Sequence, residues 1–169
     1  MQTAISSILG GLSSGIQARI NQKDFWTGKK NIIPSQALET PSGKIKAAVA
    51  GMDRSKLTPN QLGKIGEDLA AAEMREQGIE VIKGHIAYRV EGVEGHGFTD
   101  VVGIKDNYIY YWEAKNGKKV NLTPFQRKAF PLLKKGAKIQ FYGPNAIKNK
   151  LPLTPTNKYY FELKQYNIP

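Results

Sequence analysis

The 169-residue sequence contains no cysteine and only two histidines, His85 and His96. Without cysteine the chain has neither disulfide bonds nor thiolate zinc sites, and two histidines do not favour a multi-histidine metal site. Oxygen ligands and a hard cation such as Mg²⁺ or Mn²⁺ fit this composition better. Long apolar runs are also absent, and a stretch of about 18 apolar residues is the minimum for a membrane-spanning helix. The N-terminus lacks the basic region and compact apolar core of a secretory signal.

Acidic residues are missing from Ala114 to Phe161, although the chain as a whole has a net charge of +11. A field of one sign suits a polyanion, so we predict a nucleic-acid partner. The alternative is a solvated basic surface kept for solubility, which usually intersperses acids with bases. The basic residues of this stretch are Lys115, Lys118, Lys119, Arg127, Lys128, Lys134, Lys135, Lys138, Lys148, Lys150 and Lys158.

The chain has room for one domain of ordinary size with an appendage. Residues 1–52 are rich in Gly, Ser and Pro and read as a linker or short helices with little core of their own. We therefore place the domain at residues 53–169.

Two helix starts share the pattern Thr-Pro-X-Gln, which predicts a capping box with proline at the first helical position. The first helix should run from Thr58 to about Gln77 and stop at Gly78. The second should open at Thr123 and end before Gly136, kinked or shortened by its internal proline. Strands are predicted at 79–83, 98–104, 108–115, 138–142 and 159–163. This order predicts an α/β (α+β) fold in which helices flank a mixed sheet.

One pair of predicted strands carries the candidate site. If Asp106-Asn107 forms a two-residue hairpin turn, the register places Asp100 directly opposite Glu113. Facing carboxylates repel each other and need a cation between them. Side chains alternate along a strand, so Lys115 lies on the same face as Glu113. The pattern predicts a divalent-metal site beside a lysine.

The turn decides this interpretation, because a slip of one residue would move Asp100 to the opposite face. The alternative is that Asp100 ends a loop and that Glu113 and Lys115 form an ordinary surface ion pair. Three aromatic residues share the face opposite Glu113 and are predicted to be the packed side of the sheet: Tyr108, Tyr110 and Trp112.

Glu67 on the first helix, Asp100, Glu113-Ala114-Lys115 and Gln126 on the following helix resemble the PD-(D/E)XK, or restriction-endonuclease-like, nuclease superfamily. The likeness covers residues 58–141, with Thr99 at a position where the family often has proline. It implies a sheet of αβββαβ order and a metal-dependent phosphodiesterase using Mg²⁺ or Mn²⁺, with Zn²⁺ as a further candidate.

The resemblance implies a role for each matched residue. Asp100 and Glu113 would be the principal metal ligands, joined by the Ala114 carbonyl, and Glu67 would bind or orient metal-bound water. Lys115 would orient or deprotonate the attacking water and offset charge on the phosphate. Gln126 would hold the water or a phosphate, although its own capping box is an equal explanation.

Residues on the basic side of this site are the predicted nucleic-acid contacts: Lys118, Lys119, Arg127 and Lys128. His96 lies between two glycines on a loop before Asp100 and is a further candidate contact to substrate or to a softer metal. An ordinary loop histidine is the simpler interpretation of this residue.

Residues 10–28, with Gly-Gly-Leu-Ser-Ser-Gly-Ile and Asn-Gln-Lys-Asp-Phe-Trp-Thr-Gly, resemble the segment before the toxic tip of polymorphic bacterial toxins. That likeness implies the warhead of a larger secreted toxin, acting in the cytoplasm of a target bacterium. It also implies a cognate immunity protein, which electrostatics predicts to be acidic.

The sequence therefore predicts a metal-dependent endonuclease that cleaves DNA. The alternatives are a tRNA-cleaving toxin of the same fold, a nucleic-acid-binding module without catalysis, and a housekeeping repair nuclease.

Overall fold

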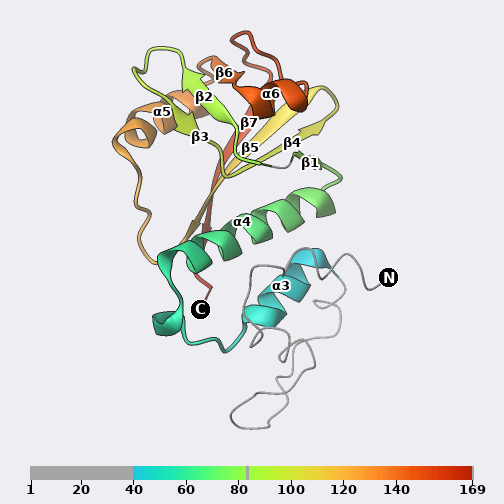
Figure 1. The fold of residues 1–169 in the computed structure, drawn as a ribbon, viewed down its shortest axis with the longest axis vertical. Helices are drawn as coiled ribbons and strands as arrows, with labels where there is room; N and C mark the ends of the chain where they lie inside the picture. The colour runs from blue at the N-terminus through green and yellow to red at the C-terminus, as the bar shows by residue number, and fades with distance from the viewer. Residues whose placement is uncertain (1–39, 83, 169) are drawn as a thin grey trace.

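A four-stranded mixed sheet forms the centre of the computed structural model, which describes residues 40–82 and 84–168 (Figure 1). Its strand order is β1-β4-β5-β7. Neighbours are antiparallel except for β5 and β7, which run parallel. The strands are β1 (Glu80–Ile82), β4 (Val101–Lys105), β5 (Tyr108–Asn116) and β7 (Tyr159–Tyr166).

Helices flank this sheet, which confirms the predicted mixed α/β class. Helix α4 (Pro59–Glu76) packs against β5, and α5 (Pro124–Lys134) packs against β7 and the second sheet. Both begin with the predicted capping box, at Thr58 and Thr123. The left-handed residues Gly78 and Gly136 follow their ends, and Pro131 is accommodated inside α5. For this sheet, the order along the chain is helix, three strands, helix, strand.

A second, three-stranded antiparallel sheet changes one prediction. It consists of β2 (Ala87–Val90), β3 (Gly97–Phe98) and β6 (Ile139–Tyr142), in the order β3-β2-β6. The strand predicted at 98–104 is therefore wrong as a single element, because Phe98 pairs in this sheet and Val101 pairs in the central one. Strand β2 was not predicted. Asp100 lies where the chain crosses between the two sheets.

The hairpin register between β4 and β5 is the predicted one. Asp106 and Asn107 have φ angles of 52° and 62°, which a type I′ turn requires at both central residues. The ladder extends to Val101 opposite Trp112. Beyond this last pair the next residues are Asp100 and Glu113, in the order that the predicted register requires.

Two hydrophobic cores cover the two faces of the central sheet. One lies between the sheets and α5, around Tyr111 and Phe141, and the other lies under α4, around Leu69 and Trp112. Close packing in the second requires glycine at position 103, where an added Cβ would lie 2.4 Å from the Ile79 side chain.

Shorter elements complete the described chain: α3 (Pro41–Val49), the 3₁₀ helix η2 (Arg54–Lys56) and α6 (Pro144–Lys148). Helix α3 lies upstream of the predicted domain start at residue 53, yet it packs on α4. The backbone N–H and hydroxyl of Ser42 donate to Glu76 at 2.7 and 3.0 Å, and Val49 is buried in the shared core. Residues 1–39, which hold the toxin-like segment and most of the linker predicted at residues 1–52, lie outside the described residues.

Candidate active site

A cleft of about 470 Å³ opens between the N-terminal half of α4 and the ends of β4 and β5. It brings together four residues that the sequence predicted for the site: Glu67, Asp100, Ala114 and Lys115. The remaining lining residues are Pro59, Leu62, Gly63, Asn116, Lys119 and Asn121.

Asp100 lies at the crossing between the sheets, where one oxygen (Oδ2) accepts a hydrogen bond from the Ala114 backbone N–H at 2.9 Å. N–H and C=O of a residue facing an antiparallel neighbour point to the same side, so the Ala114 carbonyl is also directed toward this flank. Burial, followed by the negative charge of Glu113, raises the pKa of Asp100 from its ordinary 3.8 to about 7. The two carboxylates are thus close enough to repel each other.

Glu113 is completely buried, with 0% of its surface exposed, so its ion pair with Lys115 is internal rather than the surface pair of the alternative interpretation. Three side chains donate to its carboxylate. The Lys115 ammonium and the Gln126 amide each reach Oε1 at 2.6 Å, and the Tyr111 hydroxyl reaches Oε2 at 2.7 Å. Such short charge-assisted bonds hold a carboxylate firmly in one orientation.

Gln126 serves both purposes that the sequence left open. Its side-chain oxygen accepts from the Thr123 backbone N–H at 3.0 Å, closing the capping box of α5, while its amide nitrogen donates to Glu113. The start of α5 is thereby attached to the site. Gln126 is a buried support of Glu113, and its amide is not directed at the cleft lining.

Glu67 reaches the cleft because α4 lies close to β5. At Gly66, an added Cβ would lie 3.3 Å from the Cβ of Asn116, so glycine permits this approach. Burial raises the pKa of Glu67, and the charge of His85 opposes that rise most strongly. The ring of His85 is anchored through Nδ1 to the Thr99 carbonyl at 2.8 Å, one residue before Asp100.

The predicted nucleic-acid contacts divide into two groups. Lys118 and Lys119 are exposed on the loop after β5, and Lys119 lines the cleft. Arg127 and Lys128 are exposed on the first turns of α5. His96 does not line the cleft, because its ring packs edge-on against Phe98 at the second sheet, with a centroid distance of 5.6 Å.

Sequence reasoning missed two tyrosines behind Glu113. The hydroxyls of Tyr111 and Tyr88 are hydrogen bonded at 3.0 Å, and both side chains are fully buried. Tyr111 precedes Glu113 by two positions on the same strand, so the period-two alternation would have placed it on the same face. Tyr88 belongs to the second sheet, and no pattern in the sequence around it predicts its contact with Tyr111.

The aromatic face opposite Glu113 is only partly the packed side that the sequence predicted. Trp112 is buried beneath α4, with Lys164 over its ring at 4.0 Å. Tyr108 is 40% exposed and contacts Tyr160, which is 52% exposed, at a centroid distance of 5.1 Å. The ring of Tyr110 also contacts that of Tyr160, at a centroid distance of 5.0 Å. These three rings, the tyrosine ladder, leave stacked aromatic surface open to solvent.

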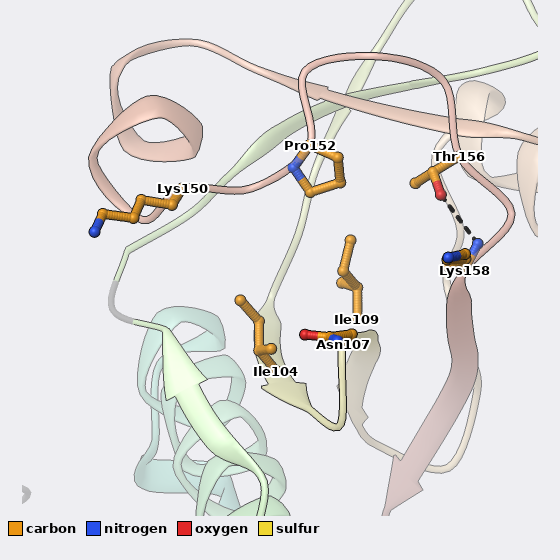
Figure 2. A pocket seen from close by; sticks show the side chains of 7 residues that line it. All are labelled: Ile104, Asn107, Ile109, Lys150, Pro152, Thr156 and Lys158. Atoms are coloured by element: carbon orange, nitrogen blue, oxygen red, sulfur yellow. Dashed lines mark hydrogen bonds between the residues drawn. The ribbon is translucent and has the colours of Figure 1, made fainter.

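A second hollow, of about 260 Å³, lies near the turn of the β4–β5 hairpin (Figure 2). Ile104, Ile109 and Pro152 supply its apolar lining. Figure 2 shows the Lys150 side chain directed away from it. The Thr156 hydroxyl oxygen accepts from the Lys158 backbone N–H at 3.1 Å, within the loop itself. This hollow therefore presents an apolar surface rather than a converging polar site.

The carboxylate and carbonyl oxygens at the cleft suit a hard cation. Two close carboxylates share only one nearby ammonium, that of Lys115, and the pKa of Asp100 stays raised beside it. Carboxylate and carbonyl oxygens are the ligands that Mg²⁺ prefers. Within residues 40–82 and 84–168, no group of three or more His, Asp or Glu side chains is arranged to hold a metal ion.

The described part of the chain contains no helix long and apolar enough to span a membrane. Comparisons with protein-family models, with curated proteins and with solved structures find no match to this chain.

Proposed function

We propose that the protein is a metal-dependent endonuclease and that the cleft is its active site. The observation that carries this proposal is the pairing of Asp100 with buried Glu113 at a cleft that also holds Lys115. Paired carboxylates beside an amine can bind a cation and neutralise a phosphate in one place.

Asp100, Glu113 and the Ala114 carbonyl would hold the cation, and Glu67 would orient water beside it. When bound, a divalent cation polarises the phosphoryl group and lowers the pKa of attached water. Lys115, at the rim of the cleft, balances negative charge that grows on the phosphate. Gln126 keeps Glu113 oriented through its 2.6 Å hydrogen bond.

The substrate we propose is DNA. Lys119 in the cleft and exposed Lys118, Arg127 and Lys128 beside it would contact the phosphate backbone, a sequence-independent interaction. The helix, three strands, helix, strand order of the central sheet supports a restriction-endonuclease-like fold. Action as the effector of an interbacterial toxin, with an acidic immunity protein, is part of the same proposal and rests on residues 10–28.

The test incubates the full chain with plasmid DNA and with total RNA, in Mg²⁺, Mn²⁺ or Zn²⁺ and in chelator. We expect cleavage with Mg²⁺ or Mn²⁺ and none with chelator. Lys115→Ala should lower the rate by about 10²–10³, the usual cost of losing one electrostatic contact to the transition state. Lys134→Ala removes the same charge from the exposed end of α5 and should leave the rate unchanged. Equal rates for the two variants would contradict the assignment.

RNA cleavage is a second candidate, which the tyrosine ladder favours. Exposed aromatic rings stack on unpaired bases, whereas the bases of duplex DNA are already stacked. If RNA is the substrate, Tyr160→Leu should slow its cleavage about tenfold, because stacking contributes roughly 1–3 kcal/mol per base. Tyr160→Phe keeps the ring and should cleave at the parental rate. If the protein cleaves RNA and neither substitution changes the rate, the tyrosine ladder does not bind substrate.

A further inference from the structure

The two carboxylate oxygens of buried Glu113 have different hydrogen-bond donors. Oε2 accepts from Tyr111, which belongs to the buried core between the sheets. Oε1 accepts from Lys115, which lines the cleft, and from the buried amide of Gln126. A carboxylate held in this way cannot turn both oxygens toward the same point in the cleft.

We propose that Tyr111 is a positioning residue that limits Glu113 to a single oxygen contact with the cation and thereby disfavours Ca²⁺ relative to Mg²⁺. This inference rests on the proposed function of the cleft. Ca²⁺ takes six to eight oxygen ligands and readily accepts both oxygens of one carboxylate, whereas Mg²⁺ binds one or two carboxylates and keeps its waters.

Tyr88 supports Tyr111 from the second sheet. A tyrosine hydroxyl has one proton, and that of Tyr111 is donated to Glu113, so the 3.0 Å bond between the hydroxyls is donated by Tyr88. The rings pack edge to face, with centroids 5.1 Å apart. Oε2 of Glu113 is thus fixed by two residues in series.

The experiment measures Mg²⁺, Mn²⁺ and Ca²⁺ binding to the full chain by calorimetric titration without substrate. We expect the parental protein to bind Mg²⁺ and Mn²⁺ more tightly than Ca²⁺. Tyr111→Phe removes only the hydroxyl, frees Oε2, and should reduce the ratio of Ca²⁺ to Mg²⁺ dissociation constants at least fivefold. Tyr88→Phe leaves the contact to Glu113 intact and should reduce the ratio by a smaller factor, at least twofold.

Tyr159→Phe is the matched control, because its hydroxyl also lies inside the fold but is within hydrogen-bond distance of the carbonyls of Leu133 and Ala137, away from the cleft. This variant should lose stability while its ratio of dissociation constants stays parental. A purely structural role for Tyr111 would give that same result.

The outcomes separate the two proposals. A parental protein that binds none of the three cations overturns both the function and this inference. Cation binding with an unchanged ratio in Tyr111→Phe overturns the inference alone. If Tyr111→Phe does not fold, an unchanged ratio in Tyr88→Phe overturns it instead.

Discussion

Asp100→Asn is expected to abolish cleavage and, at pH 8 without metal, to make the protein more stable than its parent. Asparagine keeps an oxygen that can accept from the Ala114 N–H but removes a charge that is disfavoured first by burial and then by the charge of Glu113. A pKa raised from 3.8 to about 7 corresponds to a gain on the order of 2–4 kcal/mol in the free energy of unfolding.

The sign of the pH dependence follows from the folded pKa being the higher one. Below about pH 4, Asp100 is protonated in both folded and unfolded states, so its charge costs nothing. As the pH rises toward 7, the unfolded carboxyl ionises freely while the folded one resists, and the parental protein loses stability. The advantage of asparagine should therefore be small at pH 4 and complete at pH 8.

Urea unfolding in chelator at pH 4, 6 and 8 measures this difference directly. Adding Mg²⁺ at pH 8 should then stabilise the parent and leave Asp100→Asn unchanged, because a ligand that binds only the folded state raises its stability. A variant that is less stable than the parent at pH 8 would show that Asp100 is not a strained carboxylate.

Glu113→Ala is expected to abolish cleavage as well, but with a loss of about 3–5 kcal/mol in the free energy of unfolding, typical of breaking a buried ion pair. Alanine would leave Lys115, Gln126 and Tyr111 without the acceptor that they share, and would open a cavity in a fully buried position. Two carboxylates that face each other thus have opposite effects on stability.

Glu113→Gln is the companion variant for this measurement. Glutamine keeps the volume and one acceptor oxygen of Glu113. Its amide nitrogen, however, would face at least one of the three hydrogen-bond donors and could not accept from it. Its urea midpoint should lie between those of the parent and Glu113→Ala. Equal midpoints for the parent and Glu113→Ala would mean that the three hydrogen bonds contribute nothing to stability.

Local rules predicted the parts of the site that local geometry determines. The turn at Asp106-Asn107 and the alternation of strand residues were enough to place Asp100 opposite Glu113 and Lys115 beside it. Both capping boxes were also readable, because each involves residues only three positions apart.

Tertiary packing determined what the sequence did not reveal. The apolar run at 98–104 reads as one strand, yet Thr99 donates to and accepts from the Ile86 backbone at 2.9 and 3.1 Å and so turns the chain toward the second sheet. Tyr88 reaches Glu113 only through Tyr111, a contact between distant segments. The exposure of Tyr108 likewise depends on which part of the sheet α4 covers, and periodicity carries no information on that.

The long parallel pairing of β5 with β7 has a consequence for biosynthesis. Strand β5 carries Glu113 and Lys115, and all eight of its pairs with β7 are made by residues 159–166. During synthesis, β5 emerges before residues 159–166 and lacks one of its two neighbouring strands until they follow. We therefore expect the strand that carries the proposed site to become fully ordered only after both segments have been made.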